Sequence, residues 1–154
     1  MRSSLRRSCP AETDTLALGE RIGRALVPGD LLCLTGVLGA GKTVLVRGMA
    51  LGAGIREGAV RSPTFVLHHV YRGTRLVLHH IDLYRLGPGA DIALLDVATL
   101  LDDGAVAIEW GEFADLQRLA PLWITVDTSD PAARVVELAG ESIPGRIAAA
   151  WSDA

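Results

Sequence analysis

A stretch of eight residues, Gly36 to Thr43, constrains this sequence most, because it matches the pattern G-x-x-x-x-G-K-[ST] in full. A short apolar run from Leu31 to Leu34 precedes it, and a helix-compatible segment from Val44 to Leu51 follows it. A strand, a glycine-rich loop and a helix in that order are the context in which this pattern indicates a phosphate-binding loop. The sequence therefore predicts nucleotide binding at this loop.

Each residue type in the loop has a physical reason. Gly36, Gly39 and Gly41 let the backbone bend, so that successive N–H groups can point inward at phosphate oxygens. Lys42 supplies an ammonium group for the β- and γ-phosphates, and Thr43 offers a hydroxyl to Mg²⁺. Lys42 is also the only lysine among the 15 Lys and Arg residues, so the one ammonium group stands where a compact phosphate ligand is needed.

Length and composition are those of an ordinary globular protein. The 154 residues predict a single domain over residues 1–154, with residues 1–10 as a loose tail or an edge strand. A net charge of -3 and few aromatic residues argue against direct binding of nucleic acid. Cys9 and Cys33 form no disulfide or metal pattern, and the sequence shows neither a signal peptide nor a membrane span, which favours a cytoplasmic protein.

Hydrophobic periodicity predicts helices and strands in alternation around the loop. Residues 13–26 have an apolar face at helical spacing, and residues 65–71 and 76–81 are expected to form a hairpin that turns at Gly73 and Thr74. The remaining segments are predicted as strands at 105–110, 122–126 and 134–138 and as helices at 43–51, 91–101, 112–120 and 142–151. Because a hairpin is antiparallel, the sequence predicts an α/β domain with a mixed sheet.

Two acids follow predicted strands: Asp82 comes after Leu76–Ile81, and Glu109 comes after Ala105–Ile108. An enzyme with a phosphate-binding loop needs carboxylates near Mg²⁺, and these come from strand ends at the same edge of the sheet as the loop. We therefore expect one acid to hold Mg²⁺, directly or through water, and the other to act on the attacking water. The alternative for each is a solvated turn residue.

The four histidines form two adjacent pairs, one on each arm of the expected hairpin. With the turn at Gly73 and Thr74, His68 faces His79 across the strands, which raises a zinc hypothesis, although no third or fourth ligand has suitable spacing. His80 lies two residues before Asp82 and therefore on the same side of the strand. It is either a hydrogen-bond partner of the site or an ordinary strand histidine.

Two further positions each allow two interpretations. Trp110 follows Glu109 and is either core at the end of a buried strand or a contact for the nucleotide or a partner. The segment Ser62–Phe65 is either a plain strand entry or the place where the Thr64 hydroxyl senses the γ-phosphate.

Four motifs stand in order along the chain: Leu38–Thr43, Ser62–Phe65, His80–Arg85 and Ile108–Trp110. In this order and spacing they resemble the TsaE (YjeE) family of bacterial P-loop ATPases, which are required to form threonylcarbamoyladenosine in tRNA. The resemblance runs from about Thr15 to Arg134. It implies a P-loop NTPase-like three-layer α/β fold whose mixed sheet has a parallel core and antiparallel flanking strands.

The resemblance also implies ATP and Mg²⁺ as cofactors, slow hydrolysis, and association with TsaD and TsaB homologues. In that system other members make threonylcarbamoyl-adenylate and transfer its threonylcarbamoyl group to tRNA. The TsaE-like member is not the transferase, so its ATP cycle would reset or support the TsaD–TsaB pair, and it would act on tRNA only indirectly.

Carried over motif by motif, the resemblance assigns roles to individual residues. The catalytic residues would be Lys42, Asp82 and Glu109, and the metal site would be formed by Thr43, Glu109 and Asp82. The nucleotide would be bound by Leu38, Gly39, Ala40, Gly41, Lys42, Thr43 and Thr64, with Thr15 and Arg134 beside the base. Val37 stands where family members commonly have Asp; it removes a carboxylate near the phosphates but leaves the backbone N–H groups of the loop in place.

Two other classes of protein share such a loop. A small-molecule or nucleotide kinase normally needs an arginine-rich lid, for which Arg56 and Arg61 are sparse material. A GTPase switch would need the guanine-recognition motif N-K-x-D, but the chain has no Asn and no second Lys. A nucleotide sensor that does not hydrolyse its ligand is the remaining alternative.

Overall fold

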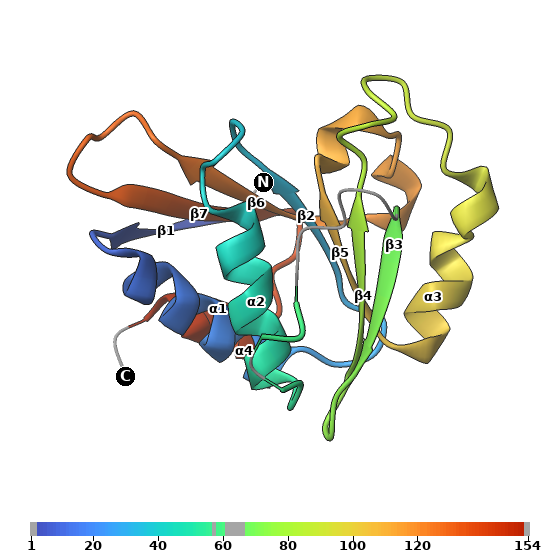
Figure 1. Cartoon of the computed structure of the whole chain (residues 1–154), viewed down its shortest axis with the longest axis horizontal. Helices are drawn as coiled ribbons and strands as arrows, with labels where there is room; N and C mark the ends of the chain where they lie inside the picture. Colours follow the sequence, from blue (N-terminus) through green and yellow to red (C-terminus); the bar gives the residue numbers. More distant parts are fainter. Residues whose placement is uncertain (1–2, 57, 61–66, 153–154) are drawn as a thin grey trace.

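The computed structural model describes residues 3–56, 58–60 and 67–152 of the chain. These residues form a seven-stranded sheet in the order β1-β7-β6-β2-β5-β4-β3 (Figure 1). The strands are β1 (Ser3–Cys9), β2 (Leu31–Thr35), β3 (His68–Arg72), β4 (Val77–Asp82), β5 (Ala105–Glu109), β6 (Leu122–Asp127) and β7 (Arg134–Gly140). Neighbouring strands from β6 to β4 run parallel, whereas β1, β7 and β3 pair antiparallel. The predicted mixed sheet is confirmed.

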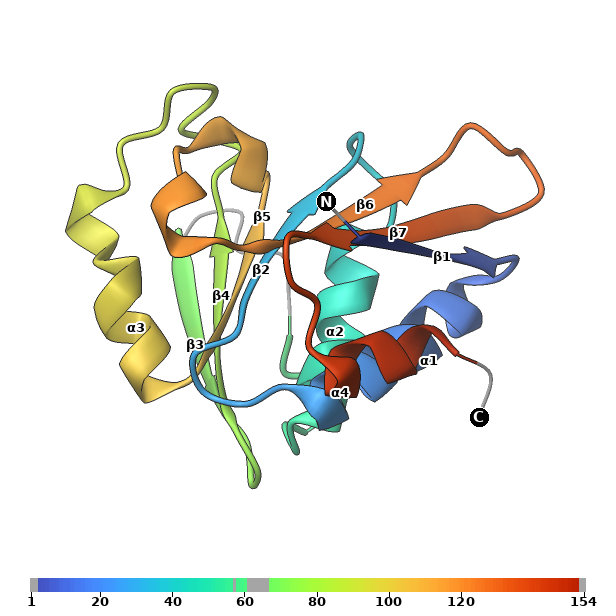
Figure 2. The same ribbon diagram turned by 180° about the vertical axis from the view of Figure 1, so that it is seen from behind.

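Helices cover both faces of this sheet (Figures 1 and 2). One face carries α1 (Glu12–Ala25), α2 (Lys42–Gly52) and α4 (Gly145–Ala148), and the other carries α3 (Val97–Asp103). Leu32 and Leu34 of β2 pack in the core beneath α1 and α2. Leu31 and Cys33 point the other way, into the core beneath α3. The three-layer fold is therefore confirmed. None of the helices in the described residues is long and apolar enough to cross a membrane.

The burial of each strand follows its place in the sheet. Every residue of β5 is buried, because β5 lies between β2 and β4 and helices cover both of its faces. β6 alternates between buried and partly exposed residues, and β1 at the edge is mostly exposed. The near-continuous apolar run before Glu109 is thus the mark of a central strand.

α1 and α2 approach each other closely through glycines. A Cβ atom added to Gly19 of α1 would lie 2.3 Å from the carbonyl oxygen of Leu45, and one added to Gly48 of α2 would lie 2.3 Å from that of Leu16. Because these distances are too short for real atoms, the two helices can pack backbone against backbone only with glycine at both positions. This contact fixes α2, the helix that follows the glycine-rich loop, against α1.

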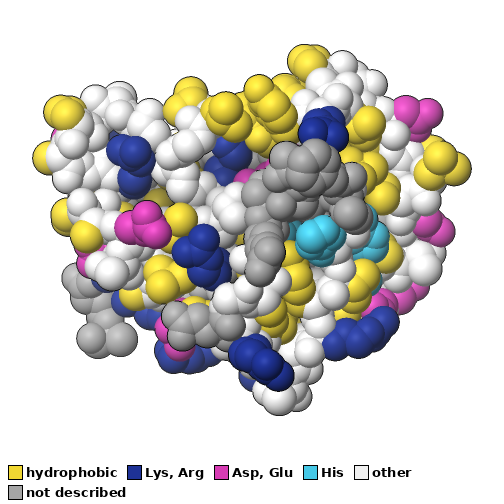
Figure 3. Space-filling model, in the orientation of Figure 1, with side chains coloured by type: hydrophobic (Ala, Val, Ile, Leu, Met, Phe, Trp, Pro, Cys, Tyr) yellow, Lys and Arg dark blue, Asp and Glu magenta, His cyan; other side chains and the backbone are white. Residues whose placement is uncertain are grey.

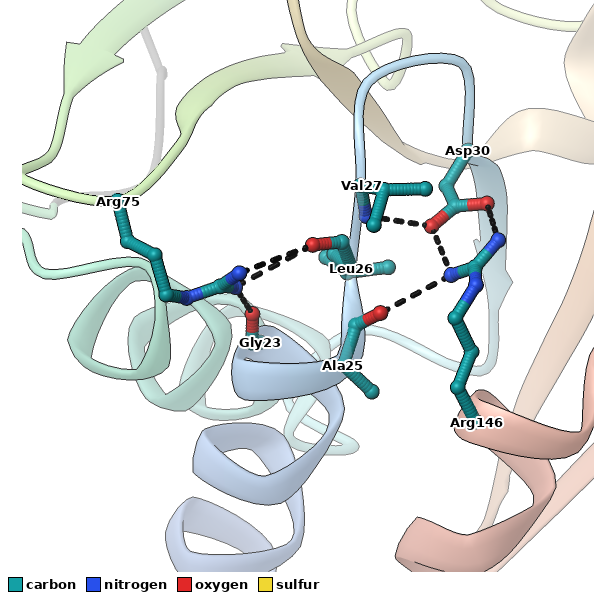
Figure 4. Close-up of polar contacts among 7 residues, drawn as sticks. All are labelled: Gly23, Ala25, Leu26, Val27, Asp30, Arg75 and Arg146. Atoms are coloured by element: carbon teal, nitrogen blue, oxygen red, sulfur yellow. Dashed lines mark hydrogen bonds and ion pairs between the residues drawn. The ribbon is translucent and has the colours of Figure 1, made fainter.

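Arg75, in the turn between β3 and β4, satisfies carbonyl groups at the C-terminal ends of both helices. Figure 4 shows its contacts at the end of α1. Its guanidinium donates hydrogen bonds to the carbonyl oxygens of Gly23 and of Leu26, the latter at 3.3 Å, and its Nε donates to Gly52 at 3.2 Å. The last carbonyls of a helix lack partners within the helix, so an arginine here stabilises both ends. It also ties the hairpin to α1 and α2.

Arg146 plays a similar part from α4 (Figure 4). Its Nη1 donates to the carbonyl oxygen of Ala25 at 3.0 Å, and its two terminal nitrogens bind the Asp30 carboxylate at 2.6 and 2.8 Å. The same carboxylate accepts a hydrogen bond from the N–H of Val27 at 2.8 Å. The connection from α1 to β2 is therefore held at both ends, which fixes where the glycine-rich loop begins.

The prediction of one continuous helix over residues 91–101 is wrong. The chain forms a 3-10 turn at Ala93–Leu95, and then α3 begins after Asp96, whose backbone is left-handed with φ 45°. The Asp96 carboxylate accepts a hydrogen bond from the Thr99 hydroxyl at 2.7 Å, a local contact that competes with a continuous helix. The predicted helices at 112–120 and 142–151 are likewise replaced by shorter elements, which are 3-10 turns at Gly111–Phe113 and Gln117–Leu119, α4, and a 3-10 turn at Ala149–Trp151.

The N-terminal segment belongs to the sheet. Ser3–Cys9 pairs with β7 along its length, with Ser3 opposite Gly140 and Cys9 opposite Arg134. The edge-strand alternative therefore holds for these residues, and the loose-tail alternative is wrong for them.

The register of the β3–β4 hairpin differs from the expected one by two residues. His79 lies opposite Val70, and His68 lies opposite Ile81, so the expected pairing of His68 with His79 is wrong. The reason is the turn, which spans residues 73–76 and is closed by a hydrogen bond of 3.0 Å from the Gly73 N–H to the Leu76 carbonyl oxygen. A four-residue turn moves every pair by two positions relative to a two-residue turn.

We expect Gly48→Ala to destabilise the protein by about 1–3 kcal/mol, because its methyl group would overlap the α1 backbone and overpacking costs energy of this order. Urea unfolding followed by circular dichroism measures the change. Gly145→Ala is the matched control, since a Cβ atom there would meet no atom within 4 Å. Equal unfolding midpoints for the two variants would contradict the close packing of α1 on α2.

Candidate functional site

The glycine-rich loop joins β2 to α2 and bends at its glycines. Gly36, Gly39 and Gly41 have φ angles of 150°, 79° and 116°, a region that residues with side chains rarely adopt. A Cβ atom on Gly36 would also lie 2.8 Å from the carbonyl oxygen of Val126. The loop in the structure therefore requires glycine at the positions where the sequence motif has it.

The N-terminus of α2 has no side-chain cap. Gly41 caps this helix without a side-chain hydrogen bond, and no acid stands in its first turn. The start of α1 differs, because the Asp14 carboxylate accepts a hydrogen bond of 2.8 Å from the N–H of Ala11. The first N–H groups of a helix lack partners within it and carry partial positive charge. The start of α2 is therefore suited to an anion.

Lys42 is nearly buried beneath the loop, with 5% of its surface exposed. Its Nζ donates hydrogen bonds to the carbonyl oxygens of Gly36 and Val37, the latter at 3.0 Å. The same nitrogen lies 4.2 Å from the centre of the Trp110 ring. The ammonium group thus has a fixed place inside the loop, with contacts that an anion could replace.

Three carboxylates surround this single ammonium group. Burial lowers the pKa of Lys42, and the nearby charges of Glu109, Glu112 and Asp82 oppose that effect. Burial also raises the pKa of the Asp82 carboxyl; a hydrogen bond from the N–H of Tyr84 lowers it, and the charge of Glu109 raises it further. These three carboxylates carry more negative charge than the Lys42 ammonium group alone balances, an arrangement that favours an added cation.

Thr43, Glu109 and His80 form a chain of hydrogen bonds beside Lys42. The Thr43 hydroxyl lies 3.0 and 3.2 Å from the two carboxylate oxygens of Glu109, and His80 Nε2 lies 2.6 Å from Oε2 of Glu109. Asp82 is the register partner of Glu109 on the neighbouring strand. A hydroxyl and two carboxylates are oxygen ligands of the type that Mg²⁺ prefers, so these residues fit a magnesium ion.

The sheet explains why these groups meet. β2, β4 and β5 are parallel neighbours, so their C-terminal ends lie at one edge of the sheet. Glu109 is the last residue of β5 and pairs with Leu34 of β2 and with Asp82 of β4. The expectation that Asp82 and Glu109 stand beside the loop agrees with this geometry.

A cavity of about 680 Å³ opens next to the loop. It is lined by Leu38–Val44, Leu67, Asp82, Tyr84–Leu86, Glu109 and Trp110. The Trp110 ring stacks on Phe113 and contacts Tyr84, with ring centres 5.1 Å apart in each case. Trp110 has a left-handed backbone, with φ 60°. The core interpretation of Trp110 holds in part, because its partly buried ring packs on the core. The ring also forms a wall of the cavity, and its contact with a nucleotide or a partner stays a prediction.

A second cavity, of about 280 Å³, lies on the other side of the loop. Thr15 of α1 and Arg134 of β7 line it together with Gly39, Ala40 and Gly41, which border both cavities. Arg134 Nε donates a hydrogen bond of 3.1 Å to the Ala40 carbonyl oxygen. The two residues expected beside the base are therefore close to the loop but separate from the acids.

The sequence did not indicate several residues of the site, and the structure does not test one residue that the sequence predicted. Thr64 lies outside the described residues. Glu112, expected in a helix, accepts a hydrogen bond of 2.7 Å from the Thr35 hydroxyl at the end of β2. Its place just after a strand that ends in Glu109 was the available signal. Tyr84 lies in the motif His80–Arg85, but the sequence did not indicate its ring contact with Trp110, and Phe113 gave no signal of its own.

The histidines on the other face form a separate chain. His68 Nε2 lies 2.9 Å from His79 Nδ1, a diagonal contact, and His79 Nε2 lies 2.7 Å from the carboxylate of Asp103. Across the part of the chain that the structure describes, no three histidines, cysteines or acids are grouped to hold a metal ion. The structure gives no support to the zinc hypothesis.

The sequence of the chain is similar to that of a known protein family over most of its length. Residues 9–136 match the family model described as threonylcarbamoyl adenosine biosynthesis protein TsaE. A Mycobacterium tuberculosis protein named tRNA threonylcarbamoyladenosine biosynthesis protein TsaE is 45% identical over 112 residues, which cover 67% of this chain and 66% of that protein. A Nostoc protein of the same name is 38% identical over 128 residues, 80% of this chain and 78% of that protein.

A solved structure shows the same fold. The crystal structure of Bacillus subtilis YdiB superimposes with a TM-score of 0.73 at 23% identity, covering 92% of this chain and 88% of that one.

The sequence match with the mycobacterial relatives covers about 66% of their length. On the family match, which takes in most of its residues, the chain belongs to the TsaE family.

Proposed function

We propose that this protein is a slowly hydrolysing, Mg²⁺-dependent ATPase that supports formation of N6-threonylcarbamoyladenosine in tRNA, acting with TsaD and TsaB homologues in the cytoplasm. One observation carries the ATPase proposal: the buried Lys42 ammonium lies inside a glycine-bent loop, next to the hydrogen-bonded pair of Thr43 and Glu109. Membership of the TsaE family supports the place in tRNA modification.

The loop would hold the phosphates through its N–H groups and Lys42. Lys42 Nζ would exchange its contacts with the carbonyl oxygens of Gly36 and Val37 for phosphate oxygens, which bind an ammonium group more strongly. The side chain of Val37 is 61% exposed and so leaves the inside of the loop to the backbone. Nucleotide binding therefore does not require an acid at position 37.

Thr43 and Glu109 would hold the magnesium ion, with Asp82 on the metal or on the attacking water. A bound Mg²⁺ would neutralise charge on the transferred phosphate. Glu109 is almost fully buried, so its carboxylate is kept from water and in one orientation. Asp82, whose pKa burial raises, is the better candidate for taking a proton from water.

The base would lie in the cavity beside Thr15 and Arg134. Because the chain contains no Asn, the usual guanine-recognition motif is absent and ATP is preferred over GTP. Thr64 remains a predicted contact for the γ-phosphate.

The mouth of the larger cavity supports a protein partner. Leu38, Tyr84 and Leu86 line this cavity, and they are 70%, 50% and 47% exposed. Figure 3 shows hydrophobic side chains gathered at the edge of the molecule where the loop between β2 and α2 lies. Exposed apolar side chains around a cavity mark a surface that a partner covers.

We expect Lys42→Ala to weaken ATP binding at least about tenfold, because a hydrogen bond to a charged group contributes about 1.5–3 kcal/mol and 1.4 kcal/mol is a factor of ten. Isothermal titration calorimetry measures the affinity. Arg24→Ala is the control, since it removes an exposed cation from the end of α1. Unchanged ATP affinity in Lys42→Ala would contradict the phosphate role of the loop.

Glu109→Gln should slow ATP hydrolysis by about 100-fold or more, as expected when a group that acts in the transition state is removed, while ADP affinity without Mg²⁺ changes little. Single-turnover hydrolysis and calorimetry separate the two effects. Glu137→Gln on β7 is the control for loss of a strand carboxylate. Equal losses of binding and turnover would count against a role for Glu109 in the reaction.

Mixing the protein with purified TsaD and TsaB homologues should give a complex whose formation depends on ATP. Size-exclusion chromatography with ATP, with ADP and without nucleotide measures this. Absence of co-elution under all three conditions would contradict the partner assignment while leaving nucleotide binding unaffected.

A further inference from the structure

We infer that His80 is a positioning residue that holds the Glu109 carboxylate toward Thr43 and away from Lys42, so that Glu109 can hold a divalent cation next to the loop. This inference rests on the proposed binding of a Mg²⁺-nucleotide. It concerns a side chain outside the motif-assigned metal ligands and nucleotide contacts.

The contact between His80 and Glu109 is direct and shielded from water. His80 is fully buried, Glu109 is 3% exposed, and 2.6 Å separates His80 Nε2 from Glu109 Oε2. A carboxylate only accepts hydrogen bonds, so Nε2 carries the proton and donates it. The Thr43 hydroxyl reaches Oε1 at 3.0 Å, which means that both oxygens of Glu109 have a neighbour that fixes their direction.

The second ring nitrogen of His80 indicates why a histidine is placed here. Nδ1 is buried and has no hydrogen-bond partner among the described residues. A buried polar atom without a partner destabilises the fold. A leucine would fill similar space without that cost, so the benefit of histidine at this position lies in the donor that it gives to Glu109.

Without that donor, Glu109 has another neighbour to bind. Lys42 is the residue before Thr43, whose hydroxyl lies 3.0 Å from Glu109, and Lys42 and Glu109 line the same cavity. A carboxylate released from His80 would pair with this ammonium group, because opposite charges attract strongly where water is excluded. Such a pair would take Glu109 from the metal and Lys42 from the phosphates. His80 keeps the two charges apart for their separate tasks.

His79 offers a matched control on the same strand. It is 3% exposed, so it is buried almost as deeply as His80. Its side chain points to the other face of the sheet, where it contacts Asp103 and His68 rather than Glu109. Replacing it disturbs the same strand without touching the site.

The test compares His80→Leu, His80→Gln and His79→Leu with the wild type. ADP affinity is measured by calorimetry with Mg²⁺ and with EDTA, and the ratio of the two gives the contribution of the metal. Loss of a group that orients a metal ligand typically reduces metal affinity about 10–100-fold. We expect a reduction of that size in the ratio for His80→Leu, with affinity in EDTA unchanged. His80→Gln, whose Nε2 can reach Glu109, should restore most of the ratio, and His79→Leu should behave as the wild type.

Two results would overturn the role of His80. One is a folded His80→Leu variant whose ratio of ADP affinities with Mg²⁺ and with EDTA equals that of the wild type. The other is an equal reduction of this ratio in His79→Leu. Thermal melting establishes folding, and His80→Asn, whose shorter amide does not reach Glu109, replaces the leucine variant if that variant does not fold. Wild-type protein that binds ADP equally with Mg²⁺ and with EDTA would contradict the proposed function itself, and the role of His80 with it.

Discussion

The hydrogen bond between Thr43 and Glu109 joins the first turn of α2 to the end of β5, and the rest of the site is arranged around it. It forms only if the helix and the strand are each held in place. Glycine contacts with α1 fix the helix, and burial between β2 and β4 fixes the strand. The position of Lys42 follows, because it is the residue before Thr43. The chemistry of the site thus depends on backbone packing some distance from it.

The burial of polar groups at this junction lowers the stability of the fold. Lys42, Glu109 and His80 are each at most 5% exposed, and burial of charged or polar groups costs free energy unless they are paired. Their contacts with one another, with Thr43 and with the loop carbonyls offset much of that cost. Nδ1 of His80 has no hydrogen-bond partner within the part of the chain that the structure describes, so the compensation there is incomplete. This is the pattern of a site selected for function at some expense of stability.

The sequence contained enough to predict the loop, the mixed sheet and the meeting of Asp82 with Glu109. Each of these rests on a local pattern: a motif between a strand and a helix, or an acid at the end of an apolar run. The break at Asp96, the hairpin register and the close approach of α1 to α2 were not predictable in this way. They depend on a side-chain contact, a turn length and the distance between two backbones, none of which changes hydrophobic spacing.

A crystal structure with a non-hydrolysable ATP analogue and Mn²⁺ in place of Mg²⁺ tests the central claim most directly. Anomalous scattering locates the manganese independently of the protein model. The account predicts a manganese peak bound to the Thr43 hydroxyl and beside Glu109, with phosphate oxygens on the N–H groups of residues 36–42 and on Lys42 Nζ. Phosphates bound away from this loop, or manganese away from Thr43 and Glu109, would contradict it.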